Sequence, residues 1–258
     1  MSASGRTLKL TVAYDGTHLV GWQRQAEGES VQGLLEDALA RFEGAPVTVH
    51  GAGRTDAGVH ALGQVASVRV TFDHDTTTLV RALNAQLPED VRILDAADVH
   101  AEFHARFSAR AKTYRYLIRN GPVTSPFERA FVWHVPQPLD VAAMQHAAAA
   151  LLGRHDFTVF RSIGTDVPDA VRTLLTSAVV DCHSAAWLGD APPLLAYEVT
   201  GDGFLRHMVR AIVGTLVEVG RGWRDPAQME ALLHARDRGR AGATAPPQGL
   251  FLVRVDYD

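Results

Sequence analysis

Residues 51–60 read Gly51-Ala52-Gly53-Arg54-Thr55-Asp56-Ala57-Gly58-Val59-His60, a glycine-rich run that combines an arginine, an aspartate and a histidine. The flanking segments 47–50 and 64–70 have the residue pattern of strands, so the run is expected to form a loop between two strands. Glycines let a backbone turn tightly or approach a ligand closely, and such loops often carry functional side chains. We therefore expect a functional site in this loop.

Two nucleotide-binding motifs fail to explain the loop. A dinucleotide-binding fingerprint needs a third glycine at a fixed spacing and a helix after it, whereas a strand is predicted here. A Walker A loop needs a lysine followed by serine or threonine, which this segment lacks. A structural turn in which Asp56 caps the backbone remains an alternative on spacing alone.

Other catalytic patterns are poorly developed. A glycosidase usually needs two carboxylates about 5–10 Å apart. Asp202 is the only tempting partner for Asp56, and it is more simply explained as part of a Gly-Asp-Gly turn that caps the next helix. His100 and His104 stand four residues apart in an extended segment without an acidic or cysteine pattern around them. We therefore expect no metal site.

Outward from the loop, apolar periodicity predicts strands mixed with single helices. Ser30 is expected to cap a helix over 31–42, and Asp140 one that ends at a left-handed Gly153. The other expected elements are strands at 7–14, 91–94, 112–119, 174–183, 194–200 and 251–257, and helices at 77–87, 204–219 and 225–236. Because strands and helices do not alternate strictly, this order favours an α+β fold with a largely antiparallel sheet.

The chain has 258 residues, which suffices for one large domain or two ordinary ones. We expect two similar α/β halves, residues 1–109 and 110–258, with a cleft between them. Neither a long apolar run nor a signal peptide is evident, so we expect a cytoplasmic protein without a membrane segment. Cys182 is the single cysteine, which excludes an internal disulfide, and we expect it to be a small buried residue in a strand.

The net charge of −4 argues weakly against a nucleic-acid partner, but the charges are unevenly distributed. Segment 101–121 contains five basic residues against Glu102 alone: Arg106, Arg110, Lys112, Arg115 and Arg119. A strip of this kind is either a solvated surface or a site that attracts phosphates.

Five motifs in order along the chain resemble the tRNA pseudouridine synthase A family. They are Gly21–Gln25, Gly53–His60, Phe103–Ser108, Tyr114–Tyr116, and Phe204–Arg210 followed by Val213-Gly214, and the resemblance extends from about Leu10 to Tyr257. It implies the pseudouridine synthase fold with a central basic cleft. The implied activity is isomerisation of uridine to pseudouridine at positions 38, 39 and 40 of the tRNA anticodon stem-loop, by a homodimer that uses neither a metal nor an organic cofactor.

The resemblance also assigns site residues. It implies that Asp56 is the catalytic carboxylate and that Arg210 is the cation that keeps it ionised, with Arg206 one turn earlier on the same helix face. Tyr114 matches a tyrosine that stacks on the target base and could handle the carbon 5 proton. Arg54 would fill the place of the flipped base or bind a phosphate.

The remaining implied contacts concern the RNA backbone. The family's tRNA-contacting strip corresponds to Phe103, His104, Ala105, Arg106 and Phe107. The chain departs from the family around 161–171, where residues 163–170 replace a more basic and polar stretch that contacts tRNA in relatives. Whether the carboxylate attacks ribose, adds to uracil or promotes a glycal stays open, and a non-catalytic RNA-binding module is the alternative class.

Overall fold

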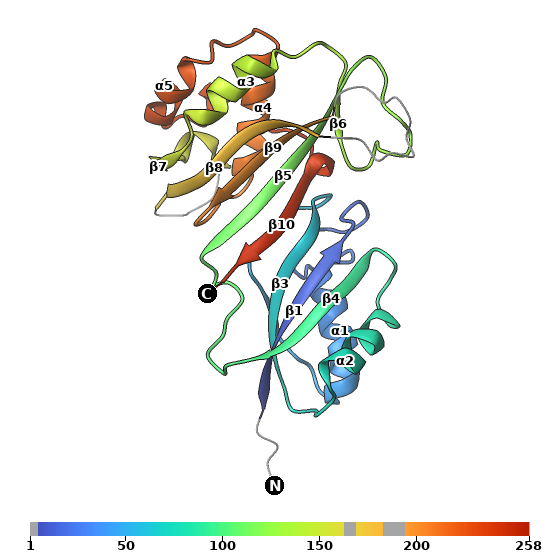
Figure 1. The fold of residues 1–258 in the computed structure, drawn as a ribbon. Helices are drawn as coiled ribbons and strands as arrows, with labels where there is room; N and C mark the ends of the chain where they lie inside the picture. Colours follow the sequence, from blue (N-terminus) through green and yellow to red (C-terminus); the bar gives the residue numbers. More distant parts are fainter. Residues whose placement is uncertain (1–4, 163–168, 183–193, 258) are drawn as a thin grey trace. The chain divides into compact units, whose positions relative to one another are not determined.

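A computed structural model describes residues 5–162, 169–182 and 194–257 (Figure 1). Its contacts divide the chain into two compact units, Met1–Arg110 with Phe251–Asp258, and Ala111–Leu250. The division at Arg110 lies one residue from the expected boundary. The last strand, which the sequence analysis placed in the second half, packs with the first unit instead.

The first unit is built on a sheet of five strands among the described residues. β1 (Arg6–Tyr14) lies between β3 (His60–Val70) and β4 (Val91–Val99) and is antiparallel to both. β2 (Val49–Gly51) pairs antiparallel with β3, and β10 (Leu250–Asp256) pairs parallel to β3 through Phe251 and Leu252. The predicted strand at 64–70 therefore begins four residues earlier, at His60, directly after the glycine-rich loop.

Two helices complete the first unit. α1 (Val31–Glu43) begins at the predicted cap, where the Ser30 hydroxyl accepts a hydrogen bond from the Gly33 N–H, and it buries Leu35 and Leu39 fully. α2 (Thr76–Asn84) is anchored to β4 because the Asn84 amide bonds both the N–H and the carbonyl of Ile93, at 2.8 Å each. Apolar residues of β1 with no solvent exposure form the centre of the core.

The second unit has the strand order β6-β5-β9-β8-β7. These strands are β5 (Ala111–Asn120), β6 (Trp133–Val135), β7 (Gly153–Asp156), β8 (Val171–Cys182) and β9 (Leu194–Gly201). β6 is parallel to β5, and the other neighbours are antiparallel. The two units thus confirm an α+β fold with a largely antiparallel sheet.

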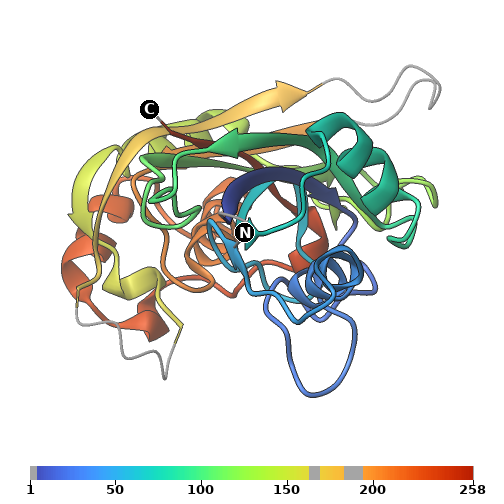
Figure 2. The same ribbon diagram turned by 90° about the horizontal axis from the view of Figure 1, so that it is seen from below.

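Three helices of the second unit pack on one another and on the sheet: α3 (Val141–Ala149), α4 (Met208–Gly220) and α5 (Gln228–Ala235). Figure 2 shows α4 and α5 on the same side of the strands. The side chain of Asp140 caps α3 as predicted, accepting from the Ala143 N–H at 2.9 Å. Short 3-10 helices lie at η1 (Thr158–Phe160), η3 (Arg238–Arg240) and η4 (Pro247–Gly249).

Two local predictions were wrong. α4 begins at Met208 and not at 204, because His207 adopts a left-handed backbone conformation with φ 61°, so Arg206 precedes the helix. Cys182 ends a strand as expected, but it is half-buried instead of buried. Within the described ranges, no helix combines the length and apolarity needed to cross a bilayer.

Candidate active site

The glycine-rich loop joins β2 to β3 and folds back on itself. The Ala52 N–H donates to the Val65 carbonyl at 2.8 Å, and the Val59 N–H donates to the Asp56 carbonyl at 3.2 Å. The loop thereby leaves Arg54 exposed and Asp56 half-buried. Its tight return gives one carboxylate a fixed place at the surface of the first unit.

The segment before α1 supports this loop through close backbone packing. The Trp22 N–H donates to the Thr55 carbonyl at 3.0 Å. At Gly21, which has φ 106°, a Cβ atom would lie 2.6 Å from the Thr55 carbonyl oxygen, and at Gly51 it would lie 2.3 Å from the Trp22 indole. Side chains at these two positions would push the loop away from its support, which explains why glycine stands at both.

A buried polar network holds the loop from beneath. The hydroxyls of Tyr14 and Thr55 are 2.8 Å apart, and the Gln64 amide donates to the Gly53 carbonyl at 2.9 Å and to the Tyr14 hydroxyl at 3.4 Å. The Gln64 side-chain oxygen accepts from the Val65 N–H. Burial raises the pKa of Tyr14 to about 12, so its phenol stays neutral and able to donate. The network fixes Gly53 and Thr55, which flank Arg54, and Thr55 directly precedes Asp56.

His60 ends the loop and is almost completely buried. Its Nδ1 lies 3.0 Å from the Gly16 N–H and 3.1 Å from a carboxylate oxygen of Asp15, and its ring stacks on Phe251 at 4.7 Å. The Gly16 N–H donates to this nitrogen, and the Asp15 carboxylate lies against the same atom. His60 therefore ties the loop to the start of β10 and has a supporting role.

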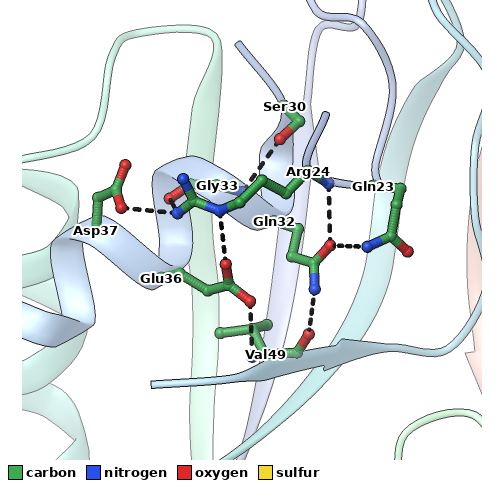
Figure 3. Close-up of polar contacts among 8 residues, drawn as sticks. All are labelled: Gln23, Arg24, Ser30, Gln32, Gly33, Glu36, Asp37 and Val49. Carbon is green, nitrogen blue, oxygen red and sulfur yellow. Dashed lines mark hydrogen bonds and ion pairs between the residues drawn. The ribbon is translucent and has the colours of Figure 1, made fainter. Parts of the chain in front are cut away.

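Figure 3 shows how the motif at residues 21–25 is held. The guanidinium of Arg24 bonds Glu36 at 2.8 Å, Asp37 at 2.7 Å and the Gly33 carbonyl at 2.9 Å, all on α1. The hydrogen bonds that Arg24 donates to Asp37 and Glu36 raise the pKa of its guanidinium.

A glutamine extends the same network to the strand. The Gln32 oxygen accepts from the Gln23 amide at 2.5 Å and from the Arg24 backbone N–H at 3.0 Å, and its nitrogen donates to the Val49 carbonyl at 3.0 Å (Figure 3). Partly exposed ion pairs add little stability. Their effect is to align the segment that supports the Asp56 loop.

The predicted RNA-contacting strip also belongs to the first unit. Ala105 is fully buried, and both of its backbone polar groups are bonded. Its N–H donates to the Ser67 hydroxyl at 3.0 Å, and its carbonyl accepts from the Tyr257 hydroxyl at 2.7 Å.

The end of the strip is exposed. Phe107 is 76% exposed, its ring centroid lies 4.4 Å from that of His104, and the Arg106 guanidinium lies 5.6 Å from the Phe107 ring centroid. Burial and the nearby charges of His50 and Arg106 lower the pKa of His104, which favours its neutral form. The strip thus presents one aromatic face and one cation to solvent, and Phe103 packs inward against Tyr257.

The second unit carries the other two predicted catalytic residues. Tyr114 lies on β5 with 7% exposure, edge-on to Phe204 at a centroid distance of 4.9 Å. Arg210 lies in the first turn of α4, and its Nε donates to the Ala245 carbonyl at 2.7 Å. The Ala245 N–H returns a bond to the Arg210 carbonyl, so backbone and side chain are both fixed.

Tyr116 shares the inward face of β5 but serves the core, as predicted. It is fully buried, and its hydroxyl donates to the Pro246 carbonyl at 2.7 Å. Burial raises the pKa of Tyr116, and the positive charge of Arg210 lowers it by less. Arg210 is itself half-buried, so its guanidinium is partly shielded from water.

The structure contradicts the expected positions of Arg206 and Asp202. Arg206 is an exposed residue outside the helix, so it does not share a helix face with Arg210. The Asp202 carboxylate accepts a hydrogen bond from the Thr173 N–H on β8, so Asp202 connects two strands and does not cap a helix.

The divergent stretch 161–171 falls mostly on residues 163–168, which lie outside the described residues. Among described side chains, no group of three or more His, Cys, Asp or Glu could hold a metal ion.

Comparison with known proteins identifies the class. A family model described as tRNA pseudouridine synthase matches residues 10–108 and 147–258. The chain therefore belongs to the tRNA pseudouridine synthase family, and it is an enzyme of the isomerase class.

Relatives that match over almost their whole length identify the branch of the family. The chain is 47% identical to "tRNA pseudouridine synthase A" of Myxococcus xanthus, covering 97% of this chain and 91% of that one. It is 46% identical to the protein of the same name from Pelobacter propionicus, covering 98% and 100%. The resemblance to the A family is confirmed, and the reaction is conversion of uridine in tRNA to pseudouridine. A solved Cbf5-Nop10-Gar1 complex matches at 12% identity with a TM-score of 0.34, over 81% of this chain and 45% of that one.

Proposed function

We propose that this enzyme isomerises uridine at positions 38, 39 and 40 of the tRNA anticodon stem-loop, with Asp56 as the catalytic carboxylate. The observation that carries the proposal is the fixed, half-buried position of Asp56 above the Tyr14, Thr55 and Gln64 network. A nucleophile or a group that assists bond cleavage must hold its geometry closely to be effective. The network holds the residue directly before Asp56, as expected for a side chain that must keep its geometry during the reaction.

The proposed roles of the other residues follow from the chemistry. The target nucleotide must leave its stack at a cost of a few kcal/mol, and Arg54, exposed beside Asp56, is placed to fill the vacated space or bind a phosphate. Tyr114 stacks on the detached uracil, and Arg210 supplies positive charge to the carboxylate. The glycosidic bond between carbon 1′ and N1 breaks, a carbon–carbon bond forms between carbon 1′ and carbon 5, and N1 takes up a proton that balances the one released from carbon 5 to water.

RNA contacts outside the active site are assigned to the strip of Phe103, His104, Ala105, Arg106 and Phe107. Its exposed end combines a ring that can stack on a base with a guanidinium that can hold a phosphate. We further propose that the enzyme works in the cytoplasm as a homodimer without metal or organic cofactor. Light scattering that showed only monomers at working concentration would remove the dimer.

The direct test is tritium release from tRNA labelled at carbon 5 of uridine. Each isomerisation sends one labelled proton to water, and mapping of pseudouridine in the product identifies the positions. We expect release that matches modification at positions 38, 39 and 40. Release with modification only elsewhere in the tRNA contradicts the proposed target site but leaves the isomerase activity in place.

The buried network gives a second test of the Asp56 assignment. Gln64→Leu leaves the Gly53 carbonyl and the Val65 N–H without their side-chain partner. We expect a loss of roughly 1–3 kcal/mol in the free energy of unfolding. We also expect a fall of roughly 10- to 100-fold in kcat, because the loop that carries Asp56 shifts. Urea unfolding and steady-state kinetics measure the two effects.

Ser177→Ala is the matched control. The buried Ser177 hydroxyl donates to the Ala148 carbonyl at 2.7 Å in the second unit, so a buried bond from a side chain to a backbone carbonyl is lost far along the chain from the loop. This variant should lose some stability and keep its kcat. Equal kcat losses in the two variants would show that activity merely follows stability.

A further inference from the structure

A hollow of about 540 Å³ lies in the second unit where β7 meets the end of α5. Its lining consists of Arg154, His155, Asp156, Leu233, His234 and Arg236. Both elements appear at the same end of the unit in Figure 1. Leu233 is the only large apolar residue in this lining, so the hollow is poorly suited to a hydrophobic ligand.

The single acidic residue of the lining is already engaged. One oxygen of Asp156 accepts from the Thr158 N–H at 2.9 Å and hydroxyl at 2.6 Å, and the other lies 3.0 Å from the Arg236 guanidinium. Burial raises the pKa of Asp156, but the Thr158 hydrogen bonds and the charges of Arg236 and Arg161 outweigh it and lower that pKa overall. The carboxylate is thus ionised and neutralises one arginine.

Positive charge remains after this pairing. Arg154 and His234 are exposed, and Arg154 has no hydrogen-bond or ion-pair partner within the described part of the chain. The end of α5 presents backbone carbonyls whose dipole disfavours an anion by about 0.3–1 kcal/mol. A charge-assisted hydrogen bond contributes about 1.5–3 kcal/mol, so the uncompensated guanidinium of Arg154 outweighs this dipole.

We propose that this hollow binds a phosphate of the tRNA backbone away from the target uridine, an inference that rests on the proposed function. A guanidinium can hold a phosphate through two parallel hydrogen bonds, and an open polar hollow admits a passing RNA strand. β7 is three strands from β5, the strand of Tyr114, which at about 4.8 Å per strand is roughly 14 Å. The contact therefore falls on nucleotides beyond the one being modified.

The test compares Arg154→Ala with wild type on full-length tRNA and on a short anticodon stem-loop RNA. With tRNA we expect KM to rise roughly three- to fivefold, kcat to stay unchanged, and the slope of log affinity against log salt to fall by about 1. With the stem-loop RNA we expect a similar rise in KM, because roughly 14 Å spans about four base steps and so still falls within the stem-loop. Arg154→Glu should strengthen the effect, because it repels the same phosphate.

Arg81→Ala on α2 removes an equal charge from an exposed site of the first unit and should leave KM unchanged. The proposal is overturned if Arg154→Ala keeps the wild-type KM and salt slope for tRNA, or if Arg81→Ala changes them equally. Fluorescence anisotropy with labelled tRNA measures the same affinities without turnover. If the wild-type enzyme formed no pseudouridine, the proposed function would be wrong. The anisotropy comparison would still show whether the hollow contributes to tRNA affinity.

Discussion

Asp56→Asn is expected to reduce pseudouridine formation by roughly 10³-fold or more while tRNA binding persists. The substitution keeps the size and hydrogen-bonding shape of the side chain but removes the negative charge that attack or assisted cleavage requires. Binding should stay equal or become slightly tighter, because one negative charge near the RNA phosphates is lost. Single-turnover tritium release and filter binding measure the two quantities on one preparation.

Asp202→Asn is the matched control for this experiment. Asp202 is the carboxylate that a two-carboxylate mechanism would need, yet its oxygen accepts from the Thr173 N–H. An asparagine oxygen can accept the same bond, so activity should remain near the wild-type level. Full activity of Asp56→Asn would remove the catalytic role of the carboxylate, and loss of activity in both variants would favour a two-carboxylate mechanism.

Local sequence signals predicted the elements whose ends are set by side chains close in the chain. Ser30 and Asp140 begin helices as expected because each supplies an acceptor for an N–H three residues later. The start of α4 was missed because Phe204 and Leu205 look like the first turn of an apolar helix. Phe204 instead packs edge-on against Tyr114, a strand residue far away in the sequence.

Local sequence signals likewise predicted only part of the candidate site. The glycine-rich loop could be found from its composition, whereas the support from Tyr14 and Gln64 depends on the pairing of β1 with β3. A signal was present, since Gln64 is a polar residue in a strand whose neighbours are mostly apolar. Such a residue is either exposed or satisfied inside the protein, and only the register of the sheet decides between them.

A buried ion pair in the second unit should make the stability of the protein sensitive to the loss of a single side chain. Arg119 on β5 has no solvent exposure, and its guanidinium bonds both oxygens of Glu128, with Nε at 3.0 Å from one of them. Glu128→Ala removes the carboxylate that pairs with this buried guanidinium. We expect a loss of roughly 3–5 kcal/mol in the free energy of unfolding, measured by urea denaturation.

Two controls separate burial from simple loss of an ion pair. Asp256→Ala removes the partner of Arg254, whose side chain is 59% exposed, and should cost less than about 1 kcal/mol. The double variant Arg119→Met with Glu128→Leu removes both charges and should be more stable than Glu128→Ala alone, because no uncompensated ion remains in the core. If the double variant is instead less stable than Glu128→Ala, the loss of stability comes from the missing packing and hydrogen bonds of the arginine. The explanation by an uncompensated buried charge is then wrong.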